Sequence, residues 1–262
     1  MSESFIKKRK GKFSVPFALF YILLYFGWSL ILSSLIKQPV LAMIIANTMG
    51  AAGYFVCKHF DSDRELVIRN LPSLSDINNG FLVFILAALT VLVFLCVQIF
   101  SISMPELITK NFQLRETAIL TVGHHSLMYI LLSVVFAPLC EECIFRGMVF
   151  PVFNRRFGLV FSVFVSSVLF AVLHGTLLHM ITAPLVGILC ALAFYLTDDV
   201  FYSIFVHSFY NFLLIMAMFA EFQLPVVDKP AAVSFLLIGY LVVVSVFVYS
   251  KRKSVLPIYD AQ

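Results

Sequence analysis

Residues 137–147 read Ala137-Pro138-Leu139-Cys140-Glu141-Glu142-Cys143-Ile144-Phe145-Arg146-Gly147, which places two carboxylates and a guanidinium inside a long apolar run. An ionisable side chain within a membrane span costs roughly 3 kcal/mol or more, so such residues usually face a bundle interior and carry function. Glu142 and Arg146 are four residues apart with the acid first, the order that favours a helical ion pair. Glu141 lies about 100° further round the helix. The stretch therefore predicts a membrane helix with one paired and one available carboxylate.

The overall composition agrees with a membrane protein. Of the 262 residues, 61% are hydrophobic and 12% are charged, and 29 are phenylalanine. A soluble domain could not cover this much apolar surface. The net charge of +4 comes largely from basic clusters near the two ends, around 7–12 and 251–253. Basic clusters that flank spans are typical of segments on the cytoplasmic leaflet, so we expect membrane lipid as a partner and no nucleic acid.

Apolar windows of about 20 residues, the length that crosses a bilayer, predict an all-α polytopic bundle of about eight transmembrane helices. The fourth window is long and contains Pro138, which should free the carbonyl four residues back and kink the helix. The sixth window is short. The predicted spans are Ser14–Ile36, Pro39–Cys57, Gly80–Ser101, Leu127–Phe153, Gly158–Gly175, Met180–Leu196, Val200–Phe222 and Ala231–Ser250.

The distribution of Lys and Arg between the loops predicts the orientation. With the N-terminus inside, fourteen of these residues fall on inner segments and four on outer ones, which together are all eighteen. This asymmetry favours a multi-pass protein of the cell membrane with both termini in the cytoplasm. No loop is long enough to form a separate domain. We therefore expect a single transmembrane domain over residues 1–262, with its polar motif core at 137–215.

Two further spans carry polar pairs at helical spacing. The fifth has Phe170 and His174 on one face, and the seventh has His207 and Asn211 on one face. Either histidine alone would be interpreted as a structural hydrogen-bonding group. Together with Glu141, they supply a base, a partner to orient water and donors for an oxyanion, which is sufficient for water-mediated acyl hydrolysis.

The same groups are also zinc ligands. A catalytic zinc site needs three protein ligands and an open fourth position, and Glu141, His174 and His207 would supply them if a divalent metal such as zinc is present. The His-Glu-x-x-His signature of soluble zinc proteases is absent. Metal dependence is therefore an open alternative to a metal-free site.

Three smaller features complete the polar inventory. His179, just after the fifth span, has either an interfacial position or a place in the same cavity. Asp198 and Asp199 lie in a tight inner turn, where they are expected to cap the next helix. The Cys140-x-x-Cys143 pair is interpreted as two small apolar side chains rather than as metal or redox ligands.

In this order, the three motifs resemble those of the CAAX prenyl protease 2-like enzymes, also called the CPBP or Abi family of intramembrane proteases. The family pattern is Glu-Glu-x-x-x-Arg, Phe-x-x-x-His and His-x-x-x-Asn/Asp, and every position matches here. The resemblance implies that Glu141 is the general base with help from His174, and that His207 and Asn211 donate to the oxyanion. It also implies that Glu142 and Arg146 support the site. Family members have been described both as metalloproteases and as glutamate-type proteases.

The favoured function is an intramembrane endopeptidase that cuts a membrane-associated peptide or protein. The processing of a bacteriocin or pheromone, self-immunity and CAAX-type processing are the roles that the resemblance suggests. A non-catalytic membrane protein for immunity, or for the regulation of a membrane sensor, is the alternative. A carrier that uses Glu141 as a relay is disfavoured, because the outer half of the bundle offers few polar groups. Nothing in the sequence points to a particular oligomeric state.

Overall fold

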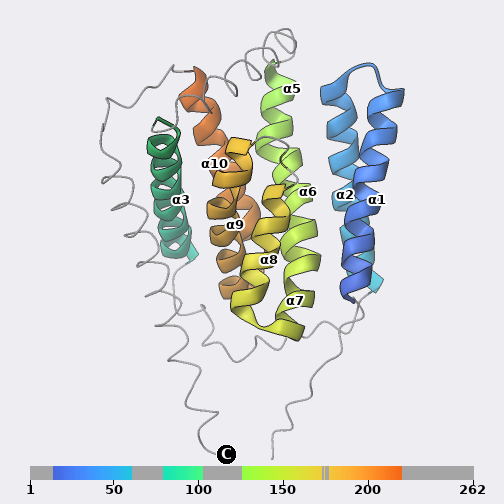
Figure 1. The fold of residues 1–262 in the computed structure, drawn as a ribbon. Coiled ribbons are helices and arrows are strands. Elements are labelled where there is room, and N and C mark those ends of the chain that lie inside the picture. The colour runs from blue at the N-terminus through green and yellow to red at the C-terminus, as the bar shows by residue number, and fades with distance from the viewer. Residues whose placement is uncertain (1–13, 61–78, 103–125, 173, 175–176, 220–262) are drawn as a thin grey trace, which may run out of the picture.

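A computed structural model describes residues 14–60, 79–102, 126–172, 174 and 177–219, and every regular element within them is helical (Figure 1). The elements, in chain order, are α1 (Val15–Leu35), α2 (Pro39–Phe60), α3 (Asn79–Ile102), α5 (Ser126–Leu131), the π-helical segment η3 (Leu132–Phe136), α6 (Ala137–Ile144), the π-helical segment η4 (Phe145–Val149), α7 (Phe150–Phe157), α8 (Leu159–Val172), α9 (Leu177–Thr197) and α10 (Val200–Phe219).

Six of the helical stretches in this part of the chain are long and apolar enough to cross a membrane. Many of their large apolar side chains point outward, with Leu23 at 70%, Leu30 at 71% and Leu35 at 73% exposure. Water would not tolerate so many exposed apolar groups on a monomer, whereas lipid chains solvate them. The predicted all-α, multi-pass membrane bundle is confirmed.

The central element is the continuous stretch from α5 to α7. Its apolar part, Leu127–Phe157, has 31 residues, which at about 1.5 Å per residue is roughly 46 Å and exceeds the hydrocarbon core of about 30 Å. Helices α1 and α2 lie on one side of it, and α8, α9 and α10 lie on the other (Figure 1). Helix α3 packs against α9 and α10. The motif-bearing helices therefore form the middle of the bundle.

Two boundary predictions need correction. The sixth span was expected to be short, but α9 has 21 residues and continues through Pro184. The fifth is the shorter one, because α8 has 14 residues and ends at Val172. The predicted eighth span, Ala231–Ser250, lies outside the described residues, as do the two basic terminal clusters.

Two local features hold α8, α9 and α10 together. A Cβ atom on Gly187 of α9 would lie 3.0 Å from the Cβ and 3.1 Å from the Cα of Ser167, so the absence of a side chain lets α8 approach closely. Asp199 Oδ1 accepts a hydrogen bond of 2.9 Å from the backbone N–H of Phe201. This is the predicted cap, and only two residues separate the end of α9 from the start of α10.

Candidate active site

The predicted ion pair forms in the fully buried centre of the bundle. Arg146 Nη1 lies 3.0 Å from Glu142 Oε1, and neither side chain is exposed to solvent. The second terminal nitrogen of Arg146 donates to the backbone carbonyl of Gly187 at 2.9 Å. The pair therefore links the central helix to α9 at Gly187, the residue against which Ser167 of α8 packs closely.

Phe170 of α8 packs against three of the motif side chains. The guanidinium carbon of Arg146 lies 4.9 Å from the centre of its ring, a distance at which a cation is attracted to an aromatic face. The rings of His174 and His207 lie 4.5 Å and 5.3 Å from it, centre to centre. The four-residue spacing from Phe170 to His174 thus places one aromatic ring in contact with both imidazoles.

His207 bridges the two adjacent glutamates. Its Nδ1 lies 2.9 Å from Glu142 Oε1, and its Nε2 lies 3.8 Å from Glu141 Oε2. A carboxylate oxygen that already accepts from Arg146 acts as an acceptor again, so the proton of this hydrogen bond resides on Nδ1. The sequence suggested that Glu141 has no partner. In the structure its carboxylate instead faces Nε2 of His207.

The protonation of His174 follows from its partner. Nδ1 lies 2.8 Å from the backbone carbonyl oxygen of Phe170. A carbonyl oxygen can only accept, so Nδ1 carries the hydrogen. In the neutral ring, Nε2 then holds a lone pair, which makes it available to accept a proton in the pocket.

Asn211 is positioned by a break in the backbone ladder of the central helix. In η3 the register is that of a π-helix, because the N–H of Ala137 bonds to the carbonyl of Leu132. The next donor in this register would be Pro138, which has no N–H, so the carbonyl of Ser133 loses its helical partner. The side chain of Asn211 donates to that carbonyl at 2.8 Å.

This geometry corrects the prediction about Pro138. The freed carbonyl is five residues back and not four, because the wider turn shifts the register. The helix continues across the proline through η3 and α6. Because Pro138 has no N–H, the carbonyl of Ser133 is left to accept the hydrogen bond from Asn211, which joins α10 to the central helix.

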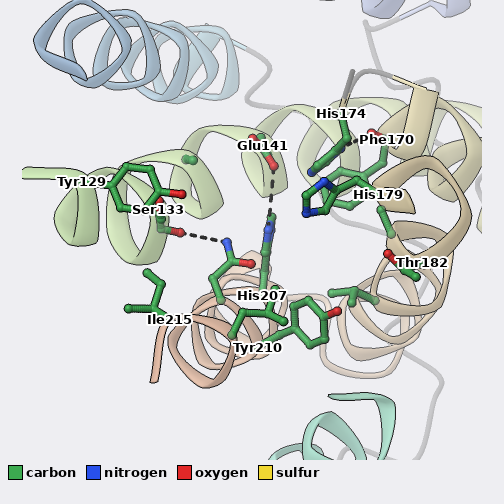
Figure 2. A pocket seen from close by; sticks show the side chains of 15 residues that line it. Tyr129, Ser133, Glu141, Phe170, His174, His179, Thr182, His207, Tyr210 and Ile215 are labelled. Carbon is green, nitrogen blue, oxygen red and sulfur yellow. Dashed lines mark hydrogen bonds and ion pairs between the residues drawn. The ribbon is translucent and has the colours of Figure 1, made fainter. Parts of the chain in front are cut away.

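A pocket of about 280 Å³ lies between α5–α6, α8, α9 and α10. Glu141, His174 and His179 point into the same space, with His207 beneath Glu141 (Figure 2). The side chain of Glu141 is 24% exposed, so water reaches it, whereas Glu142 is completely covered. The lining residues are Tyr129, Ser133, Ala137, Glu141, Phe170, His174, His179, Thr182, Ala183, Val186, His207, Tyr210, Asn211, Leu214 and Ile215.

All four residues predicted to be catalytic thus line one pocket, and the two supporting residues lie directly beneath it. Whether each has the predicted role stays a prediction. The sequence did not decide between an interfacial position and a place in the cavity for His179, and the structure places it in the pocket lining. Sequence reasoning missed Tyr129, Ser133, Thr182 and Tyr210, of which the first two were within reach. Tyr129, Ser133 and Ala137 precede Glu141 at intervals of four residues along one helix face.

The placement of the proposed metal ligands Glu141, His174 and His207 leaves metal dependence a prediction. Among the described residues, no group of three or more His, Cys, Asp or Glu side chains is arranged to hold a metal ion. Nδ1 of His207 and Nδ1 of His174 both face protein oxygens. One oxygen of Glu141, Oε2, is buried and has no hydrogen-bond partner within the described part of the chain. It faces Nε2 of His207 at 3.8 Å, so the 24% exposure of the Glu141 side chain belongs to its other atoms.

Comparison with known proteins supports the resemblance over the same region. Residues 123–213 match the family model described as type II CAAX prenyl endopeptidase Rce1-like. The chain is 30% identical over 102 residues to the Bacillus subtilis protein named "Putative membrane peptidase YdiL", which covers 38% of this chain and 42% of that protein. It is 31% identical over 101 residues to an uncharacterized protein of Mycoplasma capricolum, which covers 37% of this chain and 29% of the relative.

The matched regions thus span less than half the length of these curated relatives. No solved structure matches the chain. Any proposal about the chemistry of the pocket therefore has to start from the placement of its four motif residues, Glu141, His174, His207 and Asn211.

Proposed function

Since residues 123–213 match the type II CAAX prenyl endopeptidase Rce1-like family, we propose that the chain is an intramembrane endopeptidase of the CAAX type. Its substrate is a membrane-associated peptide or protein, and the protein lies in the cell membrane with both termini in the cytoplasm. The observation that carries the proposal is the Glu141 carboxylate, on a side chain that is 24% exposed, in a pocket that also holds two imidazoles and an amide.

The hydrolysis begins with a water molecule bound at Glu141. The carboxylate takes one proton while the water oxygen bonds to the carbonyl carbon of the substrate. His174 Nε2, whose lone pair is fixed by the bond from Nδ1 to Phe170, orients the water and shares in the proton transfer. The C–N bond then breaks, and the proton passes to the departing amine nitrogen. The products are a carboxylic acid and an amine.

The oxyanion that forms during attack needs donors on the opposite wall of the pocket. Asn211 uses one N–H of its amide for the carbonyl of Ser133, which leaves the second N–H for the substrate. His207 donates from Nε2 when both of its ring nitrogens carry protons. Glu142 and Arg146 hold His207 from below and do not contact the reacting atoms.

The decisive experiment compares Glu141→Gln and His174→Ala with the unmodified chain. Mass spectrometry of the host membrane and medium would measure the unprocessed and processed peptides. We expect the loss of the base to reduce processing by about 10²- to 10⁴-fold with the protein level unchanged. Asp199→Asn is the matched control, because it makes the same kind of carboxylate-to-amide change at a helix cap where asparagine serves equally well.

Full biological activity in both pocket variants would overturn the enzyme proposal and favour the non-catalytic immunity or regulatory protein. Metal dependence is tested separately on the purified protein. If zinc participates, a chelator should abolish cleavage and added zinc should restore it, whereas a glutamate-type enzyme should keep its activity.

A further inference from the structure

The lining of the pocket extends from Glu141 in one direction only. On the central helix it continues from Glu141 through Ala137 and Ser133 to Tyr129, toward the beginning of α5. On α10 it continues from His207 toward the end of the helix at Ile215. Figure 1 shows that α5 begins and α10 ends at the same end of the bundle, at the top of the view.

Helices α8 and α9 follow the same direction. On α8 the lining advances from Phe170 to His174 near the end of the described helix, and on α9 it runs back from Val186 to His179 near the start. Four helical segments therefore line the pocket. The central helix and α9 begin at the top of the view, whereas α8 and α10 run toward it (Figure 1). All four lead from Glu141 to the end where α5 begins, which we call the open end.

Toward the opposite end the bundle is closed among the described residues. Directly below the pocket lie Glu142 and Arg146, both with no exposed surface. Val149 and Phe150 follow on the central helix at 0% and 1% exposure. A substrate could not pass this layer without breaking the buried ion pair. Access from the end where α7 meets α8 is thus blocked.

The charges of the described residues distinguish the two ends. Lys58, Arg155 and Arg156 lie at the closed end, at the ends of α2 and α7. Lys37, between α1 and α2, is the one described Lys or Arg at the open end. In the sequence, the basic residues of 7–12 immediately precede α1, which begins at the closed end (Figure 1). An excess of Lys and Arg marks the cytoplasmic face.

We propose that the pocket opens to the extracytoplasmic side of the membrane. The substrate is then an exported peptide or protein that stays anchored in the bilayer and is cut on the outer side of the membrane midplane. This rests on the proposed intramembrane endopeptidase function and, among the roles considered for it, selects the processing of an exported peptide over CAAX-type processing. Apolar lining at Val186, Leu214 and Ile215 accommodates apolar side chains, while Tyr129 provides a hydroxyl group for an extended backbone.

Cysteine labelling of the full chain in intact cells tests the direction of opening without any need for activity. Lys37→Cys and Arg156→Cys place thiols on exposed positions at the two ends, and Tyr129→Cys places one in the pocket. The unmodified chain gives the background from its native cysteines. A membrane-impermeant maleimide should label Lys37→Cys, and a small charged methanethiosulfonate should label Tyr129→Cys. Arg156→Cys should react only after the cells are permeabilised.

The opposite pattern, with Arg156→Cys labelled in intact cells and the other two only after permeabilisation, would overturn the proposal. Failure of Tyr129→Cys to react under either condition would equally overturn it, because the pocket would not be open at that end.

A second measurement addresses the substrate. New peptide termini that appear with the unmodified chain and are lost in Glu141→Gln should map to the extracytoplasmic side of their membrane anchor. If they map to the cytoplasmic side, the substrate class is wrong while the enzyme proposal survives. If no termini depend on Glu141, the enzyme proposal itself fails, and the labelling pattern still reports the direction in which the pocket opens.

Discussion

Replacing Arg146 with methionine should destabilise the bundle strongly. The guanidinium has no exposed surface, and its contacts include the Glu142 carboxylate at 3.0 Å, the Gly187 carbonyl at 2.9 Å and the Phe170 ring at 4.9 Å. Methionine fills similar space without the charge. The variant therefore leaves a buried carboxylate without its cation and a carbonyl without its donor.

The size of the effect follows from these losses. Breaking a buried ion pair by removing one partner costs about 3–5 kcal/mol. For a chain of this size, 1 kcal/mol corresponds to about 2–4 °C in melting temperature, so the drop should be on the order of 10 °C. The double variant Glu142→Gln with Arg146→Met removes both charges and keeps an acceptor for His207. It should recover more than half of the loss.

The buried thiols provide the assay. Cys140 and Cys143 are 0% exposed and Cys190 is 1% exposed, so a fluorogenic maleimide reacts with them as the detergent-solubilised protein unfolds. Arg156→Met, which changes an exposed arginine in the same way, is the control and should melt within about 2 °C of the unmodified chain. If Arg146→Met melts as high as this control, or if the double variant is less stable than the single one, the ion pair does not hold the bundle as argued.

Two other substitutions test how the helices are joined. Asn211→Leu leaves the Ser133 carbonyl unsatisfied and should cost about 1–3 kcal/mol. In a Pro138→Ala background, the restored N–H can bond to that carbonyl, so the cost should fall by at least half in a double-mutant cycle of thermal stability; equal costs in both backgrounds would contradict the assigned register. Gly187→Ala forces a methyl group to 3.0 Å from Ser167 and should destabilise by about 1–3 kcal/mol, whereas unchanged melting would mean that α8 moves away without cost.

Sequence reasoning predicted the features that depend on spacing within one helix. The pairing of Glu142 with Arg146 and the cap at Asp199 are both confirmed, because each depends on residues fewer than five positions apart. The three motifs were expected to converge, and the structure brings their polar residues to one pocket. Here the signal was the cost of burying charge in lipid, which leaves a bundle interior as the place for such groups.

The sequence could not predict features that depend on backbone register or on contacts between helices. The sixth span was predicted to start at Met180, yet the helix begins at Leu177 and His179 faces the pocket. The carbonyl of Gly187 is a partner of Arg146 only because α8 and α9 meet there. A hydropathy window does not report either kind of contact.

The π-helical segment η3 has a consequence for how related chains can diverge. A π turn contains one residue more than an α turn, so it behaves as an insertion that the helix has absorbed. Deleting one residue from 132–136 would turn Tyr129 by about 100° relative to Glu141 and leave the Glu-Glu-x-x-x-Arg motif untouched. Changes of chain length in this segment would thus reshape the wall of the pocket at Tyr129 while Glu141, Glu142 and Arg146 keep their positions relative to one another.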